Sequence, residues 1–508
     1  MDGLTSTPLA KRVRWDDSVP PDPPQAILNA PPAAPSSCSA NDAIKLSSVT
    51  GLDASASKGQ DIRSGKEDEE VRRNGEGFRP DFTHQLFDEE RIEGFKEGDL
   101  TIRVLYTPTS LDFLVKIQTS TRDDSTRTVD VLSRLSKALP SESCTTDEPT
   151  FYQQLEGRRR DFTPPGARVH EYKRGDKVFS VYRATGEDAG ACEYHGRAQC
   201  LAPWFIEAAD NIDLSDDRWE VFYLFEEETP REILGEKWRP AALAGYFTVF
   251  GFRNPVKGVS LRICQALVLP QFQRQGHGQA LLAFLYGLAR SRESVFEITV
   301  EDPAPGFENV RNLVDARTLR DLGAFSAEIL SAGAFKRPSK DVVEAAHKIS
   351  KLTVSQVEIG FDILKARDVP EEIDEDGAGS AVSAALRSSD DNAATVNTTA
   401  GTVSDENATA APCRAVTKTD SARATIPTTV PKDGNMEAEL VDDKRKRYRL
   451  MIKRRLLKRH GEELSTDATT RKRQLEELYR DVEAGLLSLG AKLRTEEQGK
   501  KKTVASEA

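Results

Sequence analysis

The sequence contains few cysteines and no long apolar run. Its 508 residues include six cysteines scattered along the chain, which argues against a disulfide-stabilised scaffold and for a reducing compartment. They are Cys38, Cys144, Cys192, Cys200, Cys264 and Cys413. No apolar run approaches the roughly 18 residues of a membrane-spanning helix, so we expect no membrane partner.

Metal ligands are also sparse. Cys192, His195 and Cys200 lie close together in the sequence, but they offer only three ligands at a spacing unlike that of the common zinc motifs. A structural zinc site normally uses four ligands. We therefore predict no bound metal.

Composition divides the chain into several parts. Hydrophobic residues make up 38% and charged residues 30% of the sequence, which fits a soluble protein with disordered segments. The start of the chain is rich in Pro, Ala and Ser, and a later insert is rich in Asp, Ser, Ala and Thr. The predicted parts are a disordered arm (1–39), an N-terminal domain (40–190), a central domain (191–330), a small helical domain (331–370), a disordered insert (371–435) and a basic helical region (436–508).

Short apolar and alternating runs predict a mixed α/β fold. We expect strands at residues 43–49, 100–106, 111–117, 178–182, 219–225, 243–252, 264–269 and 295–300. We expect helices at residues 204–210, 342–349 and 354–365, and over most of 442–487.

The most informative segment joins the strand predicted at 264–269 to a helix with an apolar stripe. Pro270 ends the strand, and Gly276 and Gly278 lie where the helix begins. Glycine lets the backbone approach a ligand, and the free N–H groups of a helix start suit a phosphate or pyrophosphate. The order of Gln273, Arg274 and the two glycines resembles the coenzyme-A loop of the GNAT acetyltransferases and fits neither the Rossmann nor the P-loop pattern. From the glycines alone, a tight turn without a ligand is an equal alternative.

Two carboxylates follow the next predicted strand. Glu301 and Asp302 come directly after residues 295–300. Acetylation of lysine needs a neutral amine, although a free lysine has a pKa of about 10.4, so a carboxylate at the site could accept the proton. The alternative is that these acids cap the next helix.

A basic segment at residues 444–459 has three interpretations. It could be a nuclear import signal, a nucleic-acid contact or the solvated face of a helix. Leu450, Ile452, Leu456 and Leu457 interleave with the charges, which favours a helix with one packed face.

Several motifs in the same order resemble the family of type B histone acetyltransferase catalytic subunits, which belongs to the GNAT superfamily. The resemblance covers roughly residues 40–365 and resumes near Lys444. The motifs are Thr83–Phe87, Trp204–Glu207, Asp217–Trp219, Gly245–Phe252, Gln265–Gly278, Glu301–Pro303 and Tyr448–Leu456.

The resemblance implies a GNAT acetyltransferase fold with a substrate-binding N-terminal mixed α/β domain, a catalytic domain that binds acetyl-CoA, and a small C-terminal helical domain. Ala266, Leu267 and Val268 match the strand whose backbone holds the pantetheine arm, while their side chains could also be ordinary strand core. The residues that match the pyrophosphate loop are Gln273, Arg274, Gln275, Gly276, His277, Gly278 and Gln279.

The same resemblance implies catalytic and substrate-binding residues. Glu301 matches the general base, and Asp302 and Glu207 match neighbouring acids, although Glu207 could instead be a buried structural acid. The residues that match an acidic contact with the histone tail are Asp88, Glu89 and Glu90. Phe250, Gly251 and Phe252 match a further tail-contact segment, with strand core as the alternative for the two phenylalanines.

The activity implied by the resemblance is acetyl transfer from acetyl-CoA to lysines of free, newly synthesised histone, chiefly the N-terminal tail of histone H four, during chromatin assembly. The lysine amine would attack directly, without an acyl-enzyme. The family also implies a WD-repeat histone-chaperone subunit as partner and location in nucleus and cytoplasm. We expect no nucleic-acid partner. Two alternatives are a GNAT acetyltransferase for another protein or small amine, and a catalytically idle histone or nucleic-acid binder.

Overall fold

The computed structural model describes residues 36–49, 77–120, 125–227, 231–233, 236–238, 241–331, 335–369 and 433–507. Most of the arm and of the insert predicted from composition, as well as Cys413, lies outside these residues. Within them, no helix combines the length and the apolar character needed to cross a membrane.

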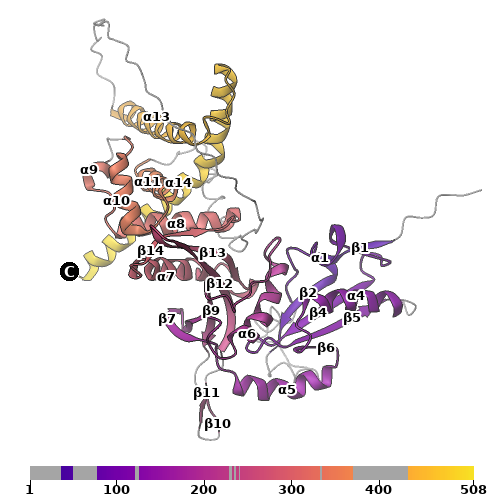
Figure 1. The fold of residues 1–508 in the computed structure, drawn as a ribbon. Coiled ribbons are helices and arrows are strands. Elements are labelled where there is room, and N and C mark those ends of the chain that lie inside the picture. Colours follow the sequence, from indigo (N-terminus) through magenta and orange to yellow (C-terminus); the bar gives the residue numbers. More distant parts are fainter. Residues whose placement is uncertain are drawn as a thin grey trace, which may run out of the picture.

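The N-terminal part contains a four-stranded sheet with strand order β2-β4-β5-β6 (Figure 1). Its strands are β2 (Ile44–Ser48), β4 (Leu100–Tyr106), β5 (Phe113–Thr119) and β6 (Cys144–Thr145). The helices of this part are α1 (Ala40–Ala43), α4 (Ser125–Ala138) and α5 (Glu148–Asp161). A separate strand pair joins β1 (Ser37–Ser39) to β3 (Arg91–Glu93), which follows the short 3₁₀ helix η1 (Asp88–Glu90).

A six-stranded sheet forms the centre of the molecule, in the order β14-β13-β12-β9-β8-β7 (Figure 1). Its strands are β7 (Ala167–Arg174), β8 (Lys177–Ala184), β9 (Trp219–Glu227), β12 (Ala241–Asn254), β13 (Gly258–Val268) and β14 (Val295–Val300). The described pieces β10 (Arg231–Ile233) and β11 (Glu236–Trp238) pair with each other. The large sheet therefore takes in two strands, β7 and β8, that precede the boundary expected at residue 190.

Strands β13 and β14 separate partway along their length. They are parallel neighbours only from Val259 to Ile263, which is opposite Val300. At this point β13 also contains a bulge, because Ile263 pairs with Val249 of β12 and Gln265 with Thr248, which leaves Cys264 unpaired in the register. Among the strand pairings of the described residues, none uses the β14-side edge of β13 beyond Ile263. Beta-bulges often accompany active sites because they bend a strand and redirect its side chains.

Helices connect several of these strands and make up most of the C-terminal part of the molecule. Between β8 and β9 lie α6 (Ala191–Ala198) and the 3₁₀ helix η2 (Gln199–Trp204), and η3 (Pro270–Phe272) leads from β13 to α7. The remaining helices are α7 (His277–Ser291), α8 (Pro305–Asp321), α9 (Ala327–Leu330), α10 (Lys340–Ser350), α11 (Val354–Ala366), α13 (Asp433–His460) and α14 (Ala468–Glu507). In Figure 1, α14, in yellow, runs beside α8 and α11, and these helices also contact one another. Among the described residues, the larger of two hydrophobic core clusters extends from Cys38 in β1 to Leu493 in α14.

The basic helix α13 packs one face against α11. Its buried residues have the spacing of a single helix face, and they are Tyr448, Met451, Ile452, Arg455 and Leu456. The expectation was wrong for Leu450 and Leu457, which are exposed on other faces. Arg455 and Arg337 both hold the buried carboxylate of Asp362, with N–O distances of 2.6 and 2.9 Å. The basic segment therefore includes part of the core.

Most of the predicted elements are confirmed, including β4 and β14 with the expected bounds. The helix expected at 204–210 is wrong, because regular helix does not continue beyond Trp204. The Trp204 carbonyl accepts hydrogen bonds from the backbone N–H groups of Asp81 and Phe82 instead of one from its own next turn. Ala208 has a φ of 53°, which is incompatible with a right-handed helix.

Candidate functional site

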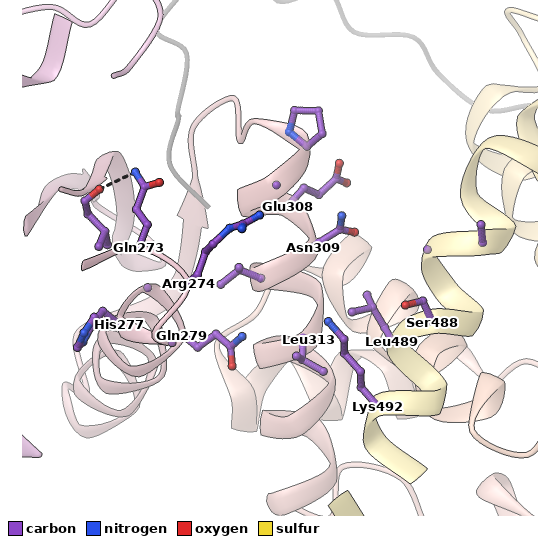
Figure 2. A pocket seen from close by; sticks show the side chains of 18 of the residues that line it. Gln273, Arg274, His277, Gln279, Glu308, Asn309, Leu313, Ser488, Leu489 and Lys492 are labelled. Carbon is purple, nitrogen blue, oxygen red and sulfur yellow. Dashed lines mark hydrogen bonds between the residues drawn. The ribbon is translucent and has the colours of Figure 1, made fainter. Parts of the chain in front are cut away.

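A cavity of about 510 Å³ lies at the N-terminus of α7 (Figure 2). The residue before the helix, Gly276, has a φ of +81° and gives the helix no side-chain cap. The helix therefore begins with backbone N–H groups that no capping side chain satisfies, as an anion site requires. The predicted cofactor residues that line the cavity are Val268, Gln273, Arg274, Gly276, His277, Gly278 and Gln279.

The two glycines of this loop play different roles. At Gly276 the positive φ disfavours any other side chain, and an added Cβ would lie 3.1 Å from the guanidinium of Arg174. Gly278 has helical backbone in the first turn of α7, with open space around the position of a Cβ. The conformational argument for glycine therefore applies only to Gly276. Arg174, on β7, places a cation next to Gly276. The sequence motif did not indicate this residue.

His277 points into the core rather than toward a ligand. Its side chain is buried, and Nδ1 lies 2.8 Å from the hydroxyl oxygen of Tyr172. Figure 2 shows this ring on the side of α7 away from Lys492. Burial lowers the pKa of His277 to about 4, and the nearby cations Arg174 and Lys177 act in the same direction. The imidazole is therefore neutral near pH 7 and adds no positive charge to the cavity.

The part of β13 that is predicted to hold the pantetheine arm has buried side chains, and its edge on the β14 side has no strand partner. Ala266, Leu267 and Val268 are at most 4% exposed, so their side chains belong to the core. They follow the point where β13 leaves β14, and Gln273 donates a hydrogen bond of 2.9 Å to the Val268 carbonyl. Gln275 is exposed and is not among the residues that line the cavity.

A second cavity of about 350 Å³ lies nearer the start of β13, at Cys264 and Gln265. Its lining residues come from β9, β12, β13, the position after β14 and the loop before β9; they are Asp210, Asn211, Ile212, Trp219, Phe250, Phe252, Cys264, Gln265 and Glu301. The rings of Trp219, Phe250 and Phe252 follow one another at centroid distances of 4.8 and 4.7 Å. The Arg218 guanidinium lies 4.6 Å from the centre of the Phe250 ring. The cavity thus has aromatic walls and a carboxylate.

That carboxylate belongs to Glu301, the predicted general base. The side chain is 22% exposed, and its Oε1 lies 3.5 Å from the guanidinium of Arg262. The Glu301 backbone N–H donates a hydrogen bond of 2.9 Å to the carbonyl of Ile263, which fixes the residue where the strands separate. Burial, and then the neighbouring Glu301 carboxylate, raise the pKa of the Cys264 thiol far above its usual range.

The other predicted acids lie outside this cavity. Glu207 and Asp302 are exposed, so the alternative of a buried structural acid is wrong for Glu207. Glu90 accepts hydrogen bonds from Asn41 and from the backbone N–H of Thr83, both of 3.0 Å.

The neighbouring carboxylates Asp88 and Glu89 are exposed. Their segment is tied to the cavity region, because Gln85 donates a hydrogen bond of 3.2 Å to the Ala209 carbonyl, directly before Asp210. Phe252 is 42% exposed, and Gly251 pairs with Leu261 in the strand without lining the cavity.

The potential zinc ligands have other contacts. The Nδ1 atom of His195 lies 3.0 Å from the Tyr223 hydroxyl, whereas the thiols of Cys192 and Cys200 face the carbonyls of Gly186 and Gly196. In the part of the chain that the structure describes, no group of three or more His, Cys, Asp or Glu residues could hold a metal ion.

Several site residues were not assigned a role from local sequence motifs. Asp210 and Gln265 reach the second cavity together, and Gln265 donates a hydrogen bond of 2.7 Å to the Asp210 carbonyl. Ser488, Leu489 and Lys492 of α14 line the first cavity although they lie about 200 residues beyond the loop. The only signal for the α14 residues was the helical pattern of the C-terminal region.

Known proteins resemble this chain over more than half of its length. Residues 36–207 match the family model described as "Histone acetyl transferase HAT1 N-terminus". Histone acetyltransferase type B catalytic subunits of Rattus norvegicus and Homo sapiens are each 31% identical to the chain over 299 residues, which cover 57% of this chain and 68% of the relative. One from Dictyostelium discoideum is 28% identical over 320 residues, 61% of this chain and 66% of the relative. In a second Dictyostelium relative the match spans 58% of the length. The chain thus covers less than two thirds of these two Dictyostelium proteins.

Proposed function

Because the chain belongs to the family of histone acetyltransferase type B catalytic subunits, we propose that it transfers acetyl groups from acetyl-CoA to lysine side chains of histones. The observation that carries this proposal is the open edge of β13. Val268 lines the first cavity and Cys264 lines the second, and the two residues are only four positions, about 13 Å, apart on one strand. A co-substrate held along this edge can therefore bring its reactive end to the second cavity.

The first cavity suits the phosphate end of acetyl-CoA. Its volume of about 510 Å³ falls within the range of small-molecule sites, and the uncapped start of α7 supplies backbone donors. The unpaired edge of β13 supplies backbone groups for the amides of the pantetheine arm.

The second cavity suits a lysine side chain. Trp219, Phe250 and Phe252 provide flat apolar walls for the four methylene groups of lysine, and Glu301 lies where the amine would end. Aromatic faces also attract an ammonium ion before it loses its proton.

Glu301 would accept that proton and leave a neutral amine. Acetyl-CoA supplies the acetyl group: the amine nitrogen forms a bond to the carbonyl carbon, the carbon–sulfur bond breaks, and the departing sulfur takes up a second proton from the nitrogen. The Cys264 thiol is a weak nucleophile because its pKa is raised, which supports direct transfer rather than an acyl-enzyme.

The proposed substrate is the N-terminal tail of free histone H four, acetylated before chromatin assembly. Exposed carboxylates at Asp88 and Glu89, in a segment tied to the cavity wall, would attract a Lys- and Arg-rich tail. A WD-repeat histone-chaperone subunit as partner, and location in both nucleus and cytoplasm, are parts of the same proposal that rest on family membership.

The test compares acetyl acceptors with the full chain. We expect acetyl-CoA turnover with a histone H four tail peptide at a kcat/KM well above that with spermidine, and acetyl-lysine in the tail by mass spectrometry of mixed core histones. Preference for spermidine would favour an acetyltransferase of small amines. Absence of turnover with every acceptor would favour a histone-binding protein without catalysis.

A further inference from the structure

The C-terminal helix α14 forms the side of the first cavity that faces the loop (Figure 2). Ser488, Leu489 and Lys492 lie on one face of α14, at helical spacing, and all three line the cavity. Ser488 and Leu489 are buried and Lys492 is half-buried. A helix far away in the sequence thus contributes a cation to the cavity that begins at Gly276.

Contacts with α8 and with the residues that follow α11 hold α14 in this place. Arg317 of α8 donates one hydrogen bond of 2.8 Å to Gln279 in the first turn of α7, and another of 2.5 Å to Glu496 of α14. Arg494 donates to the backbone carbonyls of Arg367 and Val369 at 2.7 and 2.6 Å. Leu493 has no exposed surface. The position of α14 is therefore fixed by core packing and by Arg317, which links α14 to the start of α7.

We propose that α14 completes the acetyl-CoA site and that Lys492 binds a phosphate group of the coenzyme. The inference rests on the proposed function. Coenzyme A carries a pyrophosphate and a 3′-phosphate, which is more negative charge than one helix N-terminus neutralises. His277 is neutral and turned away, so the cations that line this cavity are Arg274, on the loop, and Lys492, on the opposite wall. A half-buried ammonium group interacts with a phosphate more strongly than an exposed one, because water screens it less.

The experiment measures the binding of coenzyme A and of dephospho-coenzyme A to the full chain by calorimetry. Lys492→Gln removes the charge but keeps most of the aliphatic stem, so packing is largely preserved. Lys472→Gln makes the same change at an exposed position of the same helix, about 30 Å away along its axis, and serves as the matched control. Thermal unfolding of both variants checks that α14 stays docked.

We expect Lys492→Gln to weaken coenzyme A binding about tenfold, the usual effect of losing one charge-assisted hydrogen bond, while Lys472→Gln binds like the wild type. The loss should shrink as salt is raised. A loss confined to coenzyme A would assign Lys492 to the 3′-phosphate, and an equal loss with both ligands would assign it to the pyrophosphate. Lys492→Arg should restore most of the affinity.

Coenzyme A binding by Lys492→Gln at the level of Lys472→Gln would overturn the inference. Gly276→Val separates this failure from failure of the proposed function. If Gly276→Val loses the coenzyme and Lys492→Gln does not, the loop binds it and α14 is only a structural wall. If neither variant changes binding, the cavity is not the coenzyme site at all.

Discussion

Replacing Glu301 by Gln tests the proposed chemistry most directly. The amide keeps the size of the side chain in a partly buried position, 22% exposed, and cannot accept a proton near neutral pH. A lysine amine with a pKa of about 10.4 is only about 0.1% neutral at pH 7.5. Supplying the neutral amine can therefore account for up to roughly a thousandfold in rate, within the range of about 10² to 10⁴ for a positioned general base.

We expect kcat with a histone-tail peptide to fall by two to three orders of magnitude, on the scale of about 10² to 10³. The affinity for acetyl-CoA should change little, because Glu301 lines the second cavity and not the first. The residual rate should rise about tenfold per pH unit between roughly pH 7 and 9, since solvent then supplies the neutral lysine. Steady-state kinetics at saturating acetyl-CoA across this range measures both effects.

Neighbouring acids provide the controls. Asp302→Asn and Glu207→Gln change exposed carboxylates outside the second cavity, so we expect smaller effects from each. The base would be wrongly assigned if either variant slowed turnover as much as Glu301→Gln, which can happen when carboxylates share a proton. A Glu301→Gln enzyme within about fivefold of the wild type, with the same pH profile, would refute the general-base role altogether.

Four further outcomes are expected. Gly276→Val should raise the KM for acetyl-CoA strongly while Gly278→Ala has a small effect, because only Gly276 has a positive φ. Arg455→Ala should lower the free energy of unfolding by about 3 kcal/mol in denaturant titrations, and the same change at an exposed arginine of α13 should cost less than about 0.5 kcal/mol. Burial raises the pKa of Asp315 to about 6, so protonation of this carboxyl stabilises the folded protein fully below about pH 4. This stabilisation is lost as pH rises through 6, which lowers the free energy of unfolding by a value on the order of 3 kcal/mol. The free energy of unfolding of Asp315→Asn should lack this decline. Deleting residues 371–432 should leave kcat and KM on a tail peptide nearly unchanged, since their composition predicts no core.

Local patterns were sufficient for most strands of the two larger sheets, although not for β6 and β7, and for the start of α7. The strand that becomes β14 is a short apolar run with a sharp end, and β13 is followed by Pro270, which cannot continue a strand ladder. The position of Gly276 at the start of the helix also follows from sequence, because a positive φ needs glycine. These features depend on residues close together in the chain.

Features that depend on distant partners could not be predicted in this way. The role of Lys492 requires the docking of α14, and the irregular backbone after Trp204 requires the amides of Asp81 and Phe82. Burial of His277 follows from its contact with Tyr172, on a strand about 100 residues earlier. In each case tertiary contacts, rather than the intrinsic preference of the residue, decide the structure.

The basic helix shows how this limit affects functional interpretation. A cluster of Lys and Arg in sequence suggests an import signal, yet Arg455 is 7% exposed on its side chain and neutralises a buried carboxylate, while Lys453 and Arg449 pair with Glu476 of α14. Substituting the whole cluster would therefore remove core interactions together with any signal. An altered cellular location of such a variant would be evidence for an import signal only if its unfolding temperature were unchanged. Substitutions confined to exposed positions, such as Arg454 and Lys458, separate the two effects because they leave the Asp362 contact intact.

The separation of β13 from β14 links the two cavities to a single local irregularity. Side chains alternate along a regular strand, so the extra residue at Cys264 changes which side of β13 each later residue faces relative to β12. Without the bulge, Ile263 and Gln265 could not both keep their partners, and continued pairing with β14 would close the edge from Cys264 to Val268. A substitution that straightened β13 would then impair coenzyme binding and lysine placement together. Variants of Gly276, in the first cavity, should instead impair coenzyme binding alone, and variants of Glu301, in the second, should impair catalysis alone.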